Sequence, residues 1–166
     1  MRRALLVRAG YEGELVAAFL RSSAAYVGWC KLGDLASVAP ATVDELLLER
    51  YPECRTATGA PRKHYREILD FVYGAKRGDL VVTPDTANGR FVVGEMTGSY
   101  SYDEGSRIWS GGEVFHHSLP VKWSHAVFRA DLPLETLRDT DQRGKTTFWL
   151  REPTTEAIAA ARQRIL

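Results

Sequence analysis

The sequence has few cysteines, almost no net charge and no long hydrophobic run. Its 166 residues include two cysteines, Cys30 and Cys54, which are too few for a disulfide scaffold and are not spaced as metal ligands. The formal net charge is +1, so any site for a polyanion must come from local clustering of basic residues. No run approaches the roughly 20 apolar residues of a membrane span, and no signal peptide is visible. These absences predict a cytoplasmic protein with two free thiols.

The chain has the size and composition of one globular domain. With 45% hydrophobic and 26% charged residues, it can bury a single sizeable core. We find no internal repeat, no low-complexity segment and no linker. Residues 1–166 are therefore expected to form a single domain.

The segment from Gly78 to Trp123 has the strongest β-strand pattern. Two β-branched runs, Leu80 to Thr83 and Phe91 to Val93, flank a connector rich in turn-forming residues, which is typical of a hairpin. After a loop rich in glycine and serine, Val121 to Phe128 is strand-like again. Glycines stand where a curved sheet would bend. This segment predicts four or five short strands in a strongly curved sheet or barrel.

Helical patterns surround this segment. Apolar residues recur at helical spacing in four segments. These are Glu12 to Arg21, Val43 to Tyr51, Pro61 to Gly74, and a last segment that begins at Pro153. Thr42 with Glu45 has the spacing of a capping box. Further strands are expected at Ala4 to Val7, Ala25 to Trp29 and Thr146 to Leu150. The whole predicts an α+β fold, a small barrel of about five or six mostly antiparallel strands surrounded by helices.

Five short motifs follow one another in a defined order. They are Arg8-Ala9-Gly10; Val27-Gly28-Trp29 with Leu32-Gly33-Asp34-Leu35; Gly78-Asp79-Leu80-Val81-Val82; Val93-Gly94-Glu95-Met96-Thr97-Gly98-x-Tyr100-x-Tyr102; and His117-x-x-Pro120-Val121-Lys122-Trp123. Together they resemble the N-terminal module of predicted Mrr-type, modification-dependent restriction endonucleases, a PUA-like domain related to the EVE and YTH readers. The resemblance covers nearly the whole chain, from about Leu5 to Phe148. It implies a PUA-like pseudo-barrel with a pocket for one nucleobase flipped out of DNA or RNA, often a methylated base.

Catalysis is not expected. The Mrr-type enzymes continue into a nuclease domain where this chain ends, so the resemblance implies a free-standing reader, with a separate nuclease subunit as one conceivable partner. Asp79 and Glu95 faintly match the acidic residues of metal-dependent nucleases, but Thr97 stands where such a site needs lysine. We find no zinc spacing, nucleotide-binding loop or nucleophile elbow. The sequence thus predicts a protein without enzymatic activity, cofactor or metal.

A flipped base needs a flat apolar slot and a few polar groups for its edge. The aromatic candidates for such a slot are Trp29, Tyr100, Tyr102, Trp109 and Trp123, of which Trp109, in a loop rich in glycine and serine, is more typical of a surface residue or a wedge between bases. Tyr100 and Tyr102 alternate along a strand, so both should point to the same face. Asp34 could accept a hydrogen bond from the exocyclic amine of cytosine or adenine. The alternative is that each ring packs in the core or on the surface, and that Asp34 caps a turn or a helix.

Contacts with a nucleic acid backbone should come from a local basic face. Between Cys54 and Arg77 there are six basic residues and two acidic ones, an excess that an overall charge of +1 hides. The candidates for backbone contact are Arg8, Lys31, Arg62, Lys63, Arg66 and Lys122. Three of them, Arg62, Lys63 and Arg66, lie opposite the buried stripe of their predicted helix. The alternative is an ordinary solvated helix face.

Three classes of function remain open. The first is a reader of modified bases in double-stranded DNA, with 5-methylcytosine as the favoured mark because a methyl group adds contact area without charge. The second is an RNA-binding module for modified or structured RNA. The third is a nucleotide-binding or protein-interaction subunit of a restriction or defence system.

Overall fold

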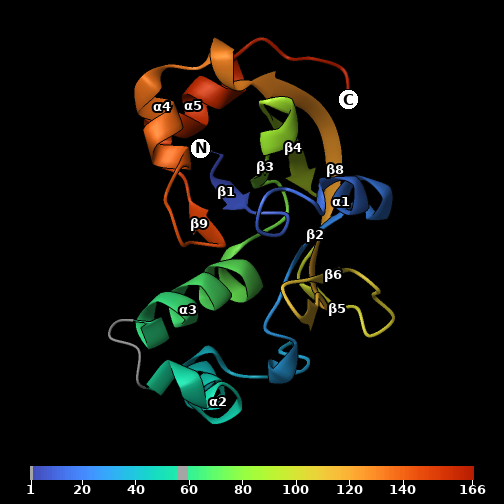
Figure 1. Cartoon of the computed structure of the whole chain (residues 1–166), viewed down its shortest axis with the longest axis vertical. Coiled ribbons are helices and arrows are strands. Elements are labelled where there is room, and N and C mark those ends of the chain that lie inside the picture. The colour runs from blue at the N-terminus through green and yellow to red at the C-terminus, as the bar shows by residue number, and fades with distance from the viewer. Residues whose placement is uncertain (1, 56–59) are drawn as a thin grey trace.

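The computed structural model of the chain describes residues 2–55 and 60–166, with the backbone alone at residues 60–62 (Figure 1). Its strands are β1 (Ala4–Val7), β2 (Ala24–Val27), β3 (Leu80–Asp85), β4 (Arg90–Met96), β5 (Ser101–Tyr102), β6 (Trp109–Ser110), β7 (Glu113–Val114), β8 (His117–Phe128) and β9 (Thr147–Trp149). Its α-helices are α1 (Val16–Ser22), α2 (Val43–Arg50), α3 (Ala60–Leu69), α4 (Leu134–Thr140) and α5 (Glu152–Ala160). A π-helical turn, Asp70–Gly74, extends α3.

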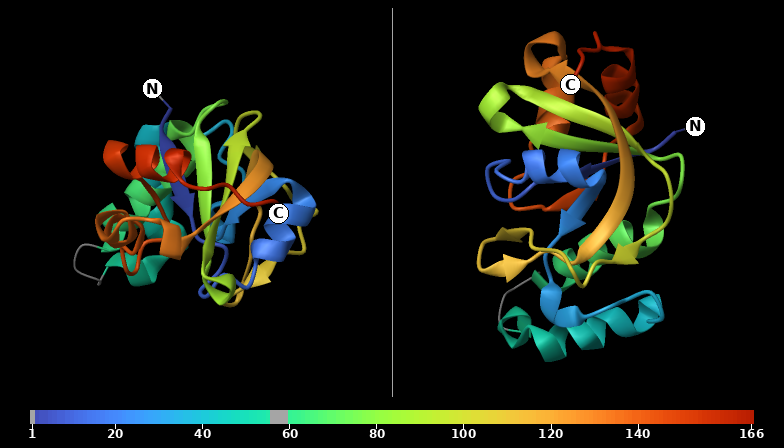
Figure 2. Two further views of the ribbon diagram at one scale, coloured as in Figure 1. Left: turned by 90° about the horizontal axis from the view of Figure 1, so that it is seen from above. Right: turned by 90° about the vertical axis from the view of Figure 1, so that its right-hand side faces the viewer.

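The main sheet has the strand order β2-β8-β4-β3-β1-β9, and β5 also pairs with β8. Strands β1 and β3 are parallel, and the other pairs are antiparallel. The long strand β8 curls across the sheet (Figure 2). The outer strands β2 and β9 do not pair with each other, so the sheet is a half-barrel. The expected α+β fold, with a curved and mostly antiparallel sheet among helices, is confirmed.

A bulge between β4 and β8 helps to bend the sheet. The register of the two strands shifts between Val93 and Gly94. A Cβ atom on Gly94 would lie 2.5 Å from Cγ1 of Val121 and 2.9 Å from the carbonyl oxygen of Lys122. Only glycine allows this close approach, and a bulge increases the local twist. The first half of β8 can therefore turn toward β2, where the candidate site lies.

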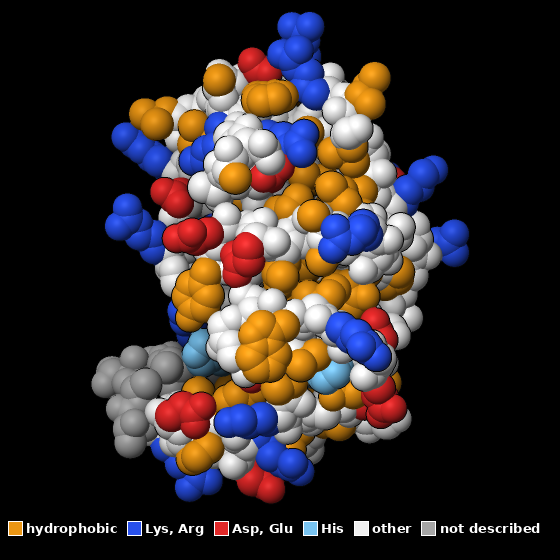
Figure 3. Space-filling model, turned by 45° about the vertical axis from the view of Figure 1, so that its right-hand side comes forward, with side chains coloured by type: hydrophobic (Ala, Val, Ile, Leu, Met, Phe, Trp, Pro, Cys, Tyr) orange, Lys and Arg blue, Asp and Glu red, His pale blue; other side chains and the backbone are white. Residues whose placement is uncertain are grey.

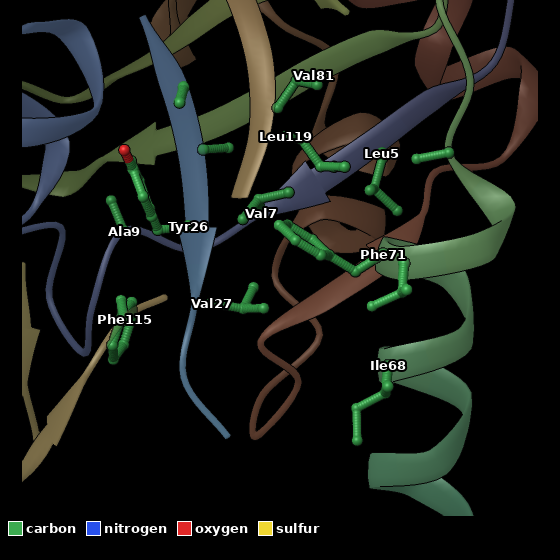
Figure 4. Close-up of a cluster of buried hydrophobic side chains, with 14 of the residues drawn as sticks. Leu5, Val7, Ala9, Tyr26, Val27, Ile68, Phe71, Val81, Phe115 and Leu119 are labelled. Carbon is green, nitrogen blue, oxygen red and sulfur yellow. The ribbon is translucent and has the colours of Figure 1, made fainter. Parts of the chain in front are cut away.

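The two faces of the sheet pack against two separate cores. On β1, Leu5 and Val7 belong to the larger core, whereas Ala4 and Leu6 belong to the smaller one, as the alternation of a strand requires. In the larger core, side chains from β1 and β2 meet Phe71 of the π-helical turn (Figure 4). Burying each large aliphatic or aromatic side chain contributes about 1.5 to 3 kcal/mol. Strand β1 therefore stabilises both halves of the molecule.

The helices lie at opposite ends of the sheet. Helices α2 and α3 pack together at one end, and α4 and α5 pack together at the other (Figure 1). Helix α1 begins at Val16, later than expected, and the Thr42 hydroxyl donates to the Ala39 carbonyl oxygen instead of capping α2. The predicted capping box is therefore wrong, because a local turn takes its hydroxyl. None of the helices in residues 2–55 and 60–166 is long and apolar enough to span a bilayer.

Candidate functional site

An open cleft of about 610 Å³ lies where β2 ends. Its volume falls within the range of roughly 300 to 1,000 Å³ that is usual for small-molecule sites. Four other parts of the chain complete it: the segment between β1 and α1, the start of α3, the β6–β7 hairpin with Phe115 after it, and the loop between α4 and β9. The lining residues are Arg8, Gly10, Tyr11, Gly28, Trp29, Lys63, His64, Ser110, Gly111, Glu113, Phe115, Asp141, Arg143, Gly144, Lys145 and Thr146. The cleft thus combines aromatic rings with a surplus of basic side chains.

Trp29 forms one wall of the cleft in an unusual backbone conformation. Its φ of 57° and ψ of 39° are left-handed, and among the described residues other than glycine only Ser23 shares a positive φ. Such a conformation costs on the order of 1 to 3 kcal/mol for a bulky residue and persists only where the surroundings enforce it. The indole is half-buried, and the His64 ring meets it edge-on with 5.9 Å between ring centroids.

Both peptide groups of Trp29 are held by side chains. The Trp29 N–H donates to Oε2 of Glu113 over 3.2 Å, and Nε2 of His117 lies 3.0 Å from the Trp29 carbonyl oxygen. Glu113 also accepts a short hydrogen bond, 2.6 Å, from the Tyr51 hydroxyl. A Cβ atom on Gly28 would lie 2.7 Å from the Glu113 carboxylate, so glycine leaves the space that this carboxylate occupies. These contacts fix the strained residue in place.

The His117 ring connects Trp29 to two of the predicted tyrosines. A carbonyl oxygen only accepts hydrogen bonds, so Nε2 of His117 carries the proton and Nδ1 accepts from the Tyr100 hydroxyl at 2.7 Å. Burial lowers the pKa of His117, which favours this neutral form. The Tyr102 ring packs edge-on against His117 with 5.3 Å between centroids. Tyr100 and Tyr102 thus both contact His117, as expected if they point to the same face. Neither tyrosine lines the cleft.

Glu67 ties α3 to the loop before β9. Its side chain is buried, and Oε1 accepts the backbone N–H of Thr146 over 3.0 Å. Its second oxygen, Oε2, lies 3.6 Å from Nδ1 of His64, and neither of these two atoms has a hydrogen-bond partner among the described residues. His64 is therefore set between the buried carboxylate and the Trp29 ring. This arrangement fixes the position of α3 relative to the opposite side of the cleft.

The mouth of the cleft has exposed aromatic side chains. Tyr11 lines the cleft and is 88% exposed, and Trp109 precedes the lining residue Ser110 and is 60% exposed. The Ser110 hydroxyl donates to the Glu14 carboxylate over 2.6 Å, which joins the hairpin to the loop that carries Tyr11. On the face drawn in Figure 3, hydrophobic side chains lie among basic, acidic and histidine side chains. Exposed rings beside cations are what a nucleic acid strand can stack on and pair with.

Three predicted site residues line the cleft together: Trp29, Arg8 and Lys63. Arg8 comes from the end of β1 and Lys63 from α3, so segments far apart in the sequence meet at Trp29. Arg8 donates to the carbonyl oxygens of Lys145 and Gln142 over 2.8 and 3.2 Å. Its guanidinium group therefore holds the loop before β9.

Besides Tyr100 and Tyr102, the predicted base-binding residues Trp123 and Asp34 also lie away from the cleft. Trp123 donates its indole N–H to the Phe19 carbonyl oxygen over 3.0 Å and stacks on the Phe19 ring. Asp34 accepts the N–H of Ala36 over 2.9 Å. Neither residue lines the cleft, and their contacts are those of the alternatives, a packed ring and a turn-capping carboxylate.

Three predicted backbone-binding residues, Lys31, Arg66 and Lys122, are exposed but do not line the cleft. The Lys31 ammonium lies over the Tyr51 ring, 5.1 Å from its centroid. The side chain of Arg62 lies outside the described residues. A role for these four residues in binding a nucleic acid backbone stays a prediction.

Several cleft residues were missed by the sequence analysis, notably Tyr11, Glu113 and Arg143. Each stands beside glycine in a turn or loop, a weak signal that many structural loops share. What distinguishes these residues from those of structural loops is that the fold brings them close to other cleft residues that are distant in the sequence. Glu113, for example, reaches Trp29 from 84 residues further along the chain.

The two acidic residues that faintly suggested a nuclease are paired with arginines. Asp79 bonds to Arg3 over 2.7 Å and accepts the N–H of Lys76 over 2.9 Å, and Glu95 pairs with Arg2. Within residues 2–55 and 60–166, no group of three or more histidine, cysteine or acidic residues is placed to hold a metal ion. The two carboxylates thus have structural partners.

The chain belongs to a protein family described as "Domain of unknown function (DUF8426)", whose model matches residues 6–151. A comparison with curated proteins found no match. Similar solved structures include the YTH domain of the Zygosaccharomyces rouxii MRB1 protein in complex with N6-methyladenosine RNA. The two chains share 16% sequence identity over 95% of this chain and 84% of that one, with a TM-score of 0.48. At this distance the two chains need not bind the same ligand, and the relation to Mrr-type modules stays a prediction.

Proposed function

We propose that this protein reads a modified base in nucleic acid, and that its ligand is duplex DNA containing 5-methylcytosine. The flipped base enters the cleft and stacks on Trp29. The observation that carries this proposal is the conformation of Trp29, a strained residue held at both peptide groups on the wall of an open cleft. Strain of this kind is found where a side chain must be presented in one orientation.

The cost of flipping a base is close in size to the free energy gained by stacking it. Flipping a base costs a few kcal/mol, and stacking it on an aromatic ring returns about 1 to 3 kcal/mol. Burying one methyl group adds only about 0.8 kcal/mol. The preference for 5-methylcytosine over cytosine should therefore be modest, and phosphate contacts must supply much of the affinity.

The protein is proposed to bind without catalysis and without a cofactor. It would act in the cytoplasm, and any cutting of marked DNA in a restriction or defence system would fall to a separate nuclease subunit. Modified or structured RNA is the alternative outcome. Binding of a free nucleotide or of a protein partner is the third possible outcome.

A single binding panel tests the proposal. The purified protein is titrated with matched duplexes that contain cytosine or 5-methylcytosine at one position, and with RNA carrying N6-methyladenosine or adenosine. Tighter binding of the 5-methylcytosine duplex without added metal supports the proposal. Equal affinity for both duplexes rejects the DNA mark, and a preference confined to methylated RNA replaces DNA with RNA as the ligand.

A further inference from the structure

We propose that Lys63 and Arg143 form an anion-binding subsite at the edge of the cleft, which takes the phosphate next to the base bound at Trp29. This inference rests on the proposed function and adds to it which backbone group is recognised and by which residues. It begins from the four basic side chains that line the cleft: Arg8, Lys63, Arg143 and Lys145.

Two of these four cations are already used within the protein. The Arg8 guanidinium donates to two backbone carbonyl oxygens of the loop before β9. The Lys145 ammonium donates to Oε1 of Gln142 over 2.6 Å. By contrast, Lys63 and Arg143 form no hydrogen bond or ion pair with the described part of the chain. They are the two cleft cations available to a ligand.

The ammonium of Lys63 lies close to the tight turn that carries Arg143. The N–H of Lys145 donates to the Gln142 carbonyl oxygen over 3.4 Å, so Arg143 and Gly144 form the centre of the turn. Gly144 has a φ of +72°, which favours glycine at this position. A Cβ atom on Gly144 would lie 3.3 Å from Nζ of Lys63, so the ammonium of α3 reaches the turn from across the cleft.

The turn is fixed before any ligand binds. Arg8 holds its carbonyl groups, and Glu67 accepts the N–H of Thr146 directly after it. A subsite that is already in place loses little conformational entropy on binding. Two carboxylates line the cleft and could compete for the cations. Glu113 is engaged by Trp29 and Tyr51, and Asp141 interacts electrostatically with Arg8. A phosphate oxygen is the ligand that suits a planar guanidinium and an ammonium lining the same cleft.

The test uses a duplex with one 5-methylcytosine and an uncharged methylphosphonate in place of a single flanking phosphate. Binding is measured for the wild type and for Arg143→Ala, with the methylphosphonate on either side of the modified base. At one of the two positions, we expect the wild type to lose about tenfold in affinity, as for a charge-assisted hydrogen bond. Arg143→Ala should bind the natural duplex about tenfold more weakly and lose little more on the substituted one.

The control variant is Arg162→Ala, which removes an exposed arginine that does not line the cleft and should behave as the wild type. If the methylphosphonate costs Arg143→Ala as much as the wild type at both positions, the subsite is wrong. Retained preference for 5-methylcytosine in that case leaves the proposed function standing. If the methylphosphonate at one position costs the wild type more than Arg143→Ala, but the wild type does not prefer the methylated base, the proposed function is rejected and the anion-binding subsite is retained. Failure to bind any of the duplexes overturns both.

Discussion

The Glu113 carboxylate accepts the backbone N–H of Trp29 over 3.2 Å, across 84 residues of sequence. Together with His117 on the carbonyl side, it holds a tryptophan in the left-handed region at the cleft wall. The orientation of the Trp29 ring therefore depends on a residue of the β6–β7 hairpin. This dependence makes the hairpin part of the candidate site.

We expect Glu113→Gln to weaken both stability and base preference. The Trp29 N–H and the Tyr51 hydroxyl donate to different oxygens of the Glu113 carboxylate, and an amide replaces one of these oxygens with an NH2 group that donates instead of accepting. Leaving a partly buried donor unpaired costs about 1 to 3 kcal/mol, and each kcal/mol lowers the melting temperature of a domain this size by about 2 to 4 °C. Thermal melting and the binding panel measure the two effects. Glu104→Gln, at an exposed position, is the control, and wild-type behaviour of Glu113→Gln would show that Trp29 does not need this carboxylate.

Removing the Trp29 ring should abolish most of the preference for the modified base. Asparagine tolerates the left-handed region, so Trp29→Asn removes the ring and keeps the backbone conformation. We expect a loss of about ten- to a hundredfold in affinity for the modified duplex, with salt-sensitive background binding unchanged. A ring that serves only packing predicts instead a stability loss of about 3 to 5 kcal/mol. Melting and binding on one preparation separate the two roles, and a well-folded variant that still prefers 5-methylcytosine would place the pocket elsewhere.

Stability should fall as the solution becomes more acidic than about pH 6.5. Burial lowers the pKa of His117 below its usual value of 6.5, so the unfolded chain binds a proton that the folded protein resists. The stabilisation is complete above the unfolded pKa and is lost as the pH falls below it. Burial lowers the pKa of His125 in the same direction, so the comparison is between the wild type and His117→Gln. Melting curves from pH 8 to pH 5 should be flatter for His117→Gln, and equal slopes would exclude His117 as a source of the acid sensitivity.

Lys63→Ala should weaken binding to methylated and unmodified DNA alike. Removing one phosphate contact reduces the slope of log affinity against log salt by about 0.9. Titrations at several salt concentrations measure this slope, with Arg162→Ala as the control. Arg66→Ala tests the outer face of α3, where the side chain is exposed and outside the cleft. A normal slope for Lys63→Ala combined with a reduced one for Arg66→Ala would place the DNA backbone on that face.

Magnesium or manganese should not induce cleavage of DNA by this protein. Asp79 and Glu95 are paired with arginines, and releasing them for a metal would break those pairs. The measurement is incubation of methylated and unmodified plasmid with each ion. Cleavage that Asp79→Ala abolishes would identify a nuclease.

The local patterns of the sequence were enough to predict most of the architecture. Strand β1 falls at a short apolar run, and β3 and β4 fall where two β-branched runs flank turn-forming residues. The helical stripes of α2 and α3 were recognised. The failure at Thr42 is local, because its hydroxyl has a nearer acceptor than the helix N-terminus. The curved, mostly antiparallel sheet also followed from its glycines, such as Gly94 at the bulge.

The composition of the site could be predicted only in part. Trp29, Arg8 and Lys63 were identified because an aromatic or basic side chain stands at the end of a strand or on the polar face of a helix. The same rules selected Trp123, which packs on Phe19, and Asp34, which caps a turn. Residue type and local spacing are alike in both groups, so the sequence does not separate a cleft wall from a packed ring.

The tertiary structure alone decided which residues meet. Glu113, His117 and Trp29 come from three segments, and the curl of β8 together with the β6–β7 hairpin brings them within hydrogen-bond distance. The turn that carries Arg143 lies beside Lys63 because Arg8 and Glu67 fix the loop between α4 and β9 against α3. Such encounters depend on strand register and long-range packing. A pattern read along a few neighbouring residues has no information about either.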